Sequence, residues 1–460
     1  MLFQSLSFAV FLPVVFALYW GLPDRCRPWI LLVAGYVFYA FAGPPYLLLL
    51  IFVTMVSRFA GHVLAERKRE KSGGILALSV VLILAPLAVY KALGFFNTGI
   101  PVPVGLSFYS FQAVGYLIDV RRGKVKPAGT LREHMLFLSF FPQLLAGPIA
   151  RGDRLLPQLT DLPAFSCPMA AIGIRRIFWG LFKKLVLADV LAYNANIVFS
   201  DPSRYRGAAL LLAALMFSLE IYCDFSAYSD MALGVAALFG IRLEENFRQP
   251  YFADSVRDFW SRWHISLSTW FRDYVYIPMG GNRKGVCRRD VNLFVTFFLS
   301  GLWHGSGVTF LVWGILHALL QIAERHLEAL HRLAAGPFLR RFMRMIRTII
   351  VFLLVTSAWV FFRAKTLSDA CMFFTHGLDG ILSPAAYLKE GVSVFHDKTA
   401  LILSCILLIG VDLLSLKEDF FEWLERRPPA LRLGGTVAFL LLFWWLLPDR
   451  PTTQFLYFAF

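Results

Sequence analysis

The residue of this chain that most directly suggests chemistry is His304, in the stretch FFLSGLWHGSG. It follows fourteen residues, 290–303, in which Asp290 is the only charged side chain. A titratable group inside a membrane segment is costly, so it is a functional candidate by default. An imidazole titrates near neutral pH and suits a general base, which accepts the proton of an attacking hydroxyl group. A packing histidine that joins two helices is the alternative.

The neighbours of His304 favour the catalytic interpretation. Gly301, Gly305 and Gly307 carry no side chains, and we expect them to leave room for another molecule beside the imidazole. Trp303 precedes the histidine directly and is a candidate for binding that molecule.

A second candidate histidine, His264, lies in DFWSRWHISLSTWFRDYVYIPMGGNRKG, residues 258–285. Arginines such as Arg272 are mixed there with large aromatic side chains, so the segment is too polar to span a membrane. The pattern predicts an amphipathic helix over 254–275 at the membrane interface, followed by a glycine turn.

Three carboxylates, Glu220, Asp224 and Asp230, interrupt the apolar stretch LEIYCDFSAYSDMALG. Buried carboxylates need partners, and we expect Arg or Lys contacts from the 254–275 helix. Both a structural ion-pair cluster and a substrate-binding role for Asp224 fit this pattern.

The C-terminal stretch TTQFLYFAF has no charged side chain. One interpretation is a belt of aromatic residues in the lipid interface. The other is a tail that folds back into the protein, which would deliver the Tyr457 phenol toward the membrane interior.

The composition indicates that the chain is a polytopic membrane protein. The 460 residues are 58% hydrophobic and 16% charged, which is far more apolar than a soluble domain. The net charge of +15 comes from basic clusters between apolar runs, so it does not indicate nucleic-acid binding. The six cysteines are scattered and predict neither a disulfide framework nor a metal site.

Apolar runs that approach the about 20 residues of a membrane span recur along the chain. The clear candidates are 2–20, 28–43, 45–65, 74–96, 207–223, 290–304, 307–324, 344–362, 399–415 and 433–448. Shorter or amphipathic pieces, which suit re-entrant or interfacial helices, are 104–119, 131–147, 171–192, 225–240 and 254–275. Irregular backbone at membrane depth is buried in protein or lines a cavity, so these pieces indicate a cavity.

Basic loops set the orientation, because Lys and Arg concentrate on the cytoplasmic side of membrane proteins. The basic segments 66–71, 121–126, 282–289 and 425–432 are therefore assigned to the cytoplasm. Counting spans from these segments places both termini outside the cytoplasm.

Five stretches together resemble the membrane-bound O-acyltransferase family, and within it the alginate O-acetyltransferase branch. They are PVGLSFYSFQAVGYLIDV, FFPQLLAGPIAR, YCDFSAYSDMALG, FWSRWHISLSTWFRDYVYIPMGGNRKG and LSGLWHG, in family order. The related branches include peptidoglycan and cellulose O-acetylation proteins and the teichoic-acid D-alanyl transfer protein.

The resemblance implies an all-α polytopic fold. About 10–12 transmembrane helices of about 20 residues each would form a ring around a thinned centre, with re-entrant and interfacial helices and a funnel from each side. We expect one membrane-embedded domain over 1–460. Its parts would be N-terminal helices over 1–102, a motif-bearing core over 103–325 and C-terminal helices over 340–460.

The resemblance also implies the site. His304 corresponds to the family's Trp-His-Gly histidine, His264 to its second histidine, and Tyr457 to the tyrosine of a terminal aromatic motif. The expected donor is a cytoplasmic thioester, acetyl-CoA, docked near Arg283 and Lys284 with Arg272 close by.

The expected reaction transfers the acetyl group across a bacterial inner membrane to a polysaccharide acceptor. It would proceed through an acyl-Tyr457 ester or by direct attack of the acceptor hydroxyl. The expected partners are the lipid bilayer, acetyl-CoA and a separate extracytoplasmic O-acetyltransferase, with no bound cofactor or metal ion.

Two other classes of protein fit the composition. A transporter or channel would need polar residues along a path through the membrane, whereas the polar groups here gather near one depth. A scaffold of a polysaccharide export complex would leave the glycine-flanked His304 unexplained. Acylation of a lipid or protein with a long-chain donor is a further alternative within the enzyme class.

Overall fold

The computed structural model describes residues 1–96, 99–327, 337–449 and 453–456. Every regular element in these ranges is helical, which confirms the predicted all-α polytopic fold. The described residues form two compact units, one of residues 1–181 and 228–245 and the other of residues 182–227 and 246–456. Each unit is described by itself.

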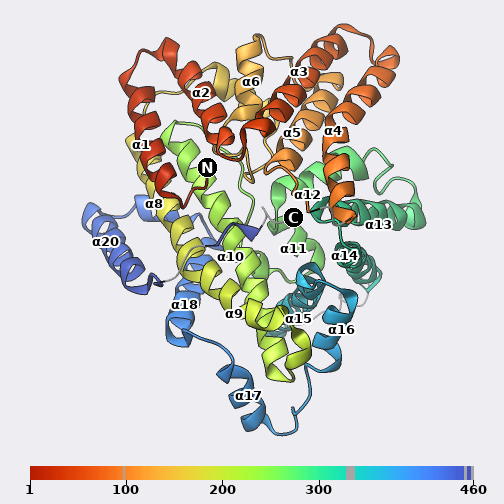
Figure 1. The fold of residues 1–460 in the computed structure, drawn as a ribbon, viewed down its shortest axis with the longest axis vertical. Coiled ribbons are helices and arrows are strands. Elements are labelled where there is room, and N and C mark those ends of the chain that lie inside the picture. Colours follow the sequence, from red (N-terminus) through yellow and green to blue (C-terminus); the bar gives the residue numbers. More distant parts are fainter. Residues whose placement is uncertain (97–98, 328–336, 450–452, 457–460) are drawn as a thin grey trace. The chain divides into compact units, whose positions relative to one another are not determined.

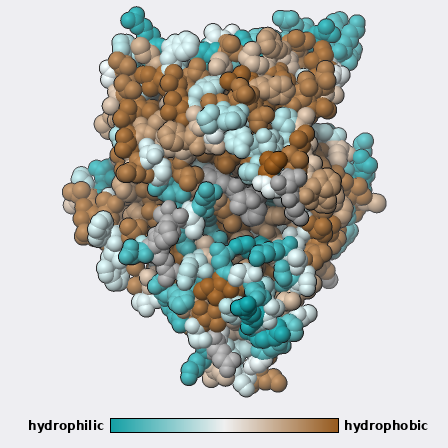
Figure 2. Space-filling view, viewed as in Figure 1, coloured by the Kyte–Doolittle hydropathy of each residue, from teal (hydrophilic) through white to brown (hydrophobic). Residues whose placement is uncertain are grey.

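The helices of the first unit are α1 (Leu6–Gly21), α2 (Arg27–Ala40), α3 (Pro44–Glu66), α4 (Gly73–Phe95), α5 (Leu106–Arg121), α6 (Leu131–Ser139) and α7 (Gly152–Thr160), with the 3-10 turns η1 (Asp24–Cys26) and η2 (Arg69–Lys71). α3 packs against both α4 and α5, and α2 packs against α6 (Figure 1). Large apolar side chains such as Leu6 and Leu48 are 82% and 69% exposed on the outer faces of these helices. Figure 2 shows this hydrophobic surface over α1–α4, as expected of helices that face lipid.

The elements that lie within the second unit are η3 (Lys183–Ala188), α9 (Asp189–Phe199), η4 (Pro202–Arg204), η5 (Pro250–Phe252), α11 (Val256–Arg262), α12 (Ile265–Phe271), η6 (Arg272–Tyr276), α13 (Gly285–His304), α14 (Val308–Leu327), α15 (Pro337–Arg363), α16 (Leu367–Thr375), α17 (Pro384–Ser393), α18 (Lys398–Ser415), α19 (Phe420–Glu425) and α20 (Pro429–Leu446). α13 packs along α14, α14 packs along α15, and the short α11 contacts both α14 and α15. α8 (Cys167–Phe182) and α10 (Ala208–Leu238) run from one unit into the other.

Seven helices of the described residues are long and apolar enough to cross a membrane: α3, α4, α10, α14, α15, α18 and α20. They account for seven of the ten clear candidate spans. α1 and α2, with 16 and 14 residues, are shorter than a full span, and α13 carries charged side chains in its first turns.

Two predicted segment boundaries were wrong. The candidate span 207–223 and the short piece 225–240 are one helix, α10, of 31 residues. Two of the three carboxylates in this stretch, Asp224 and Asp230, are paired with basic side chains from other elements, and the helix continues through them. The predicted helix over 254–275 is instead two short helices, α11 and α12, which break at residues 263–264 and are followed by the π-helical turn η6.

Candidate active site

His304 is the last residue of α13 and is 4% exposed. The helix ends there because Gly305 takes an extended backbone conformation. The imidazole lies among three aromatic rings, with ring-centroid distances of 4.7 Å to Trp303, 4.9 Å to Trp313 and 5.3 Å to Phe362. Aromatic packing therefore fixes the orientation of the ring.

The glycines near His304 make room for a neighbouring helix of the same chain. A Cβ atom on Gly305 would lie 2.2 Å from atoms of the Phe310 ring, and one on Gly301 would lie 2.6 Å from the Phe310 carbonyl oxygen. The expectation that these two glycines leave open space for a substrate was wrong, because α14 fills it. A Cβ atom on Gly307 would make only ordinary contacts, 3.5 Å or more from its neighbours.

His264 occupies the break between α11 and α12 and is fully buried. Its backbone φ of 42° lies in the left-handed region, which a non-glycine residue adopts only when its surroundings enforce it. Asn246 holds the break, because its carbonyl oxygen accepts from the Ile265 N–H at 2.9 Å and its side-chain oxygen accepts from the Ser266 N–H at 3.2 Å. Burial lowers the pKa of His264, so the ring is neutral.

The two candidate histidines both contact the indole ring of Trp303. The Trp303 ring centroid lies 4.7 Å from that of His304 and 6.1 Å from that of His264. His264 also packs edge-on against Phe225 at 4.6 Å. His304 and His264 thus belong to one aromatic cluster, although forty residues separate them in the sequence.

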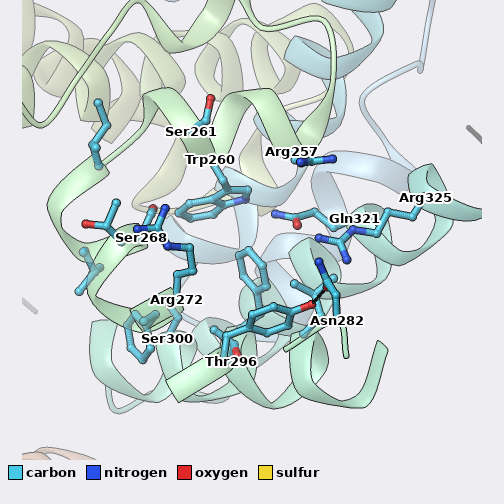
Figure 3. Close-up of a pocket in the computed structure, with 17 residues that line it drawn as sticks. Arg257, Trp260, Ser261, Ser268, Arg272, Asn282, Thr296, Ser300, Gln321 and Arg325 are labelled. Atoms are coloured by element: carbon cyan, nitrogen blue, oxygen red, sulfur yellow. Dashed lines mark hydrogen bonds between the residues drawn. The ribbon is translucent and has the colours of Figure 1, made fainter. Parts of the chain in front are cut away.

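A cavity of about 420 Å³ lies between α11, α12, α13 and α14. Three arginines, Arg257, Arg272 and Arg325, line it together with several hydroxyl groups. Figure 3 shows Arg257 and Arg325 on one side of the Trp260 indole and Arg272 on another. Such a lining favours a ligand that is anionic at one end.

One face of α13 runs from the lining of this cavity to His304. Thr296 and Ser300 line the cavity, and they precede His304 by eight and four residues. Residues four apart share a face of an α-helix, so all three side chains lie along one stripe. Ser300 is one turn from His304, an axial rise of about 6 Å. The cavity therefore reaches to within one helical turn of the imidazole.

Aromatic side chains separate the cavity from His304. Trp260 lines the cavity, and its indole N–H donates to Nδ1 of the buried His317 at 3.2 Å. The Trp313 ring then lies 5.0 Å from that of His317 and 4.9 Å from that of His304. The buried His317 thus holds the Trp260 indole in this wall.

The predicted donor-binding residues separate into two groups. Arg272 lines the cavity, whereas Arg283 and Lys284 lie in the exposed turn before α13 and are not among the lining residues. Four further lining residues, Arg257, Arg325, Thr296 and Ser300, were not among the predicted site residues. Thr296 and Ser300 could have been predicted, because they precede His304 at four-residue spacing. The two arginines could not, because their position beside the cavity depends on how α11 and α14 pack.

Asp224 has a partner other than the one expected. Its Oδ1 lies 2.8 Å from Nζ of Lys184, which belongs to η3. In the first unit, Asp230 pairs with Arg176 of α8 at 3.4 Å. The prediction that the 254–275 helix supplies these partners was wrong, because lysine and arginine side chains near 176–184 reach α10 instead. In the described ranges no group of three or more His, Cys, Asp or Glu side chains is arranged to hold a metal ion.

The described part of the C-terminal stretch, residues 453–456, folds back into the second unit. Phe455 is 2% exposed, and the main chain on either side of it bonds to charged side chains of that unit. Tyr457 itself lies outside the described residues.

The chain matches the model of the membrane-bound O-acyltransferase family over residues 131–364, which include both candidate histidines. It is 39% identical to the protein named "Probable alginate O-acetylase AlgI" of Pseudomonas fluorescens, over 80% of this chain and 74% of that protein. The "Peptidoglycan O-acetyltransferase" of Helicobacter pylori is 31% identical over 84% of this chain and 81% of the relative. The "Teichoic acid D-alanyltransferase" of Bacillus subtilis is 28% identical over 66% and 81%.

The chain therefore belongs to the membrane-bound O-acyltransferase family, and it is a multi-pass membrane enzyme that transfers acyl groups to oxygen.

Proposed function

We propose that the protein transfers an acetyl group from cytoplasmic acetyl-CoA across a bacterial inner membrane, for O-acetylation of an extracytoplasmic polysaccharide. The choice of acetyl group and of polysaccharide is supported by the names of the alginate and peptidoglycan O-acetylating relatives. The observation that carries the catalytic part is the arginine-lined cavity whose α13 face leads to His304.

The lining of the cavity supports a coenzyme A thioester as the donor. Arg257, Arg272 and Arg325 suit its phosphate groups, since guanidinium groups pair with phosphates through two parallel hydrogen bonds. The stripe formed by Thr296 and Ser300 would guide the pantetheine arm along α13. Over the fourteen residues from position 290 to His304 the helix rises about 21 Å, which an extended arm of this kind covers.

His304 acts as the general base in this proposal. Its imidazole takes the proton of an attacking hydroxyl while that oxygen bonds to the thioester carbonyl carbon. The carbon–sulfur bond then breaks, and the imidazolium returns the proton to the sulfur, so that free coenzyme A leaves. The aromatic wall around His304 excludes water, which would otherwise hydrolyse the thioester.

The attacking hydroxyl in this proposal is that of Tyr457, which becomes an acetyl ester. A phenol has a pKa near 10 and is easier to deprotonate than a sugar hydroxyl. In the second step an acceptor hydroxyl attacks the ester carbonyl, takes the acetyl group and restores the phenol. A separate extracytoplasmic O-acetyltransferase would then place the group on the polymer.

The first test is incubation of the purified protein with acetyl-CoA labelled in the acetyl group, followed by mass spectrometry of the C-terminal peptide. We expect one acetyl group on Tyr457, and none in Tyr457→Phe. His304→Ala should slow the labelling about 100-fold or more, the usual contribution of a general base. If Tyr457→Phe still acetylates polymer at the normal rate, the relay step is wrong and direct attack by the acceptor takes its place.

The second test concerns donor binding. Arg272→Gln removes one charged partner of the donor phosphates and should raise KM for acetyl-CoA about tenfold, with a smaller effect on kcat. Arg283→Gln and Lys284→Gln change the exposed turn outside the cavity, and they test whether that turn contributes to donor binding. An unchanged KM in Arg272→Gln would exclude this cavity as the donor site.

A further inference from the structure

A buried cluster of three charged side chains, Lys184, Asp189 and Asp224, takes no part in the chemistry proposed above. We propose that this cluster is a docking site for the main chain of residues 453–456, and that it positions the tail for acyl transfer. The positioning role rests on the proposed Tyr457 relay, whereas the docking site does not.

The π-helical turn η3 creates the cluster. Nζ of Lys184 lies 2.8 Å from Oδ1 of Asp189 and 2.8 Å from Oδ1 of Asp224, and the three side chains are at most 9% exposed. Lys184 and Asp189 are five residues apart, and five steps in an α-helix would turn them about 140° away from each other. In η3 the Asp189 N–H donates to the Lys184 carbonyl oxygen across five residues, which brings both side chains to one side. π-helical turns are rare and often occur at functional sites.

The cluster has more negative than positive side chains. Two carboxylates face one ammonium group, and a buried carboxylate without donors is strongly unfavourable. Residues 453–456 supply the missing donors. The Thr453 N–H and hydroxyl donate to the two oxygens of Asp189 at 3.3 and 2.5 Å, and the Leu456 N–H donates to Oδ2 of Asp224 at 2.7 Å.

Lys184 completes the recognition of the tail. Its ammonium group donates to Oγ1 of Thr453 and to the Gln454 carbonyl oxygen, both at 3.2 Å. It also lies 4.7 Å from the centre of the Phe455 ring, in a cation–π contact. The cluster thus binds main-chain atoms of three tail residues, and it also contacts the Thr453 hydroxyl and the Phe455 ring.

This site holds the main chain of residues 453–456, which directly precede the proposed nucleophile in the sequence. The proposed relay needs the tail to bring its nucleophile to the reacting carbonyl carbon, and a docked main chain favours this. Restricting a nucleophile in this way raises its effective concentration at the reacting carbon. Lys184, Asp189 and Asp224 are therefore positioning residues, which act on the reaction through the tail.

The docking site is tested by hydrogen–deuterium exchange of the purified full-length protein in detergent. Asp224→Asn removes the charge that holds the Leu456 N–H, and Thr453→Val removes the hydroxyl without altering the membrane helices. Both should raise the amide exchange rate of the C-terminal peptide about tenfold or more, while exchange in α13 and α14 stays unchanged. Gln454→Ala is the matched control, because the cluster uses only the carbonyl of that residue, and its exchange should equal that of the wild type.

An unchanged exchange rate in both Asp224→Asn and Thr453→Val would overturn the docking site. The positioning role is tested separately in a single turnover with labelled acetyl-CoA. Thr453→Val should slow acetylation of Tyr457 about tenfold while donor binding stays as in the wild type. If the tail is released and acetylation of Tyr457 does not slow, the positioning role is wrong. If Tyr457 is not acetylated in the wild type, the relay fails and the exchange result still decides the docking site.

Discussion

Gly305 shows how one position beside His304 constrains two helices. Its backbone is extended, a conformation open to any residue, so the requirement for glycine comes from space and not from φ. The Phe310 ring of α14 occupies the place of a side chain, and the same ring lies 4.9 Å from that of Phe362, which contacts the imidazole. A methyl group at position 305 would therefore displace the Phe310 ring and, through Phe362, disturb the packing around His304.

We expect Gly305→Ala to lower both stability and activity. Its Cβ would lie 2.2 Å from Phe310, so α14 or the ring must move, and overpacking of this kind costs about 1–3 kcal/mol. Thermal unfolding in detergent and the rate of acetyl transfer measure the two effects. Gly307→Ala is the matched control, because its Cβ would meet only ordinary contacts from 3.5 Å outward. Equal behaviour of the two variants would contradict the packing role of Gly305.

At the level of elements, α13 runs from the lining of the arginine-rich cavity to His304. Ser300 is 5% exposed, lines the cavity and lies one turn before His304 on the same face. Leu302 lies on another face of the helix and is 45% exposed. A substitution at Ser300 therefore changes the cavity, whereas a substitution at Leu302 changes the helix without changing the cavity.

Ser300→Leu should block the cavity one turn before His304. The added side-chain volume would fill the proposed path of the pantetheine arm, and we expect kcat/KM for acetyl-CoA to fall at least about tenfold. The unfolding temperature should change little because the added volume enters the cavity. Leu302→Phe adds bulk on another face and should leave kcat/KM unchanged. Normal kinetics in Ser300→Leu would mean that the donor reaches His304 by another route.

The sequence predicted which elements carry the site better than it predicted where they begin and end. His304 and His264, which were both predicted site residues, contact the same Trp303 ring, and the predicted Arg272 lines the neighbouring cavity. The break at His264 could not be predicted, because it depends on Asn246, eighteen residues away, whose carbonyl and side chain hold the backbone open. Likewise, the continuity of α10 through Asp224 depends on Lys184, and no local pattern in either segment indicates that pair.

For the whole molecule, the composition and the spacing of apolar runs were sufficient to predict a multi-pass membrane protein. The direction of transfer depends in addition on which side each loop faces, and that prediction rests on the distribution of Lys and Arg. Cys287 at the start of α13 and Cys371 on α16 are both exposed and lie on the two predicted sides. α13, α14 and α15 separate them, so the chain makes an odd number of crossings whether α13 and α14 span fully or return as a re-entrant pair.

Labelling with a membrane-impermeant maleimide therefore tests the orientation. In variants that keep a single cysteine, we expect Cys371 to react in intact spheroplasts, and Cys287 to react only after permeabilisation. Cys287 lies within the basic segment 282–289, whose first residue, Asn282, lines the arginine-rich cavity, so its labelling reports the side from which a donor would enter. Reaction of Cys287 in intact spheroplasts would place the cavity outside, where acetyl-CoA is not supplied. The proposed direction of transfer would then be wrong, while membership of the O-acyltransferase family would be unaffected.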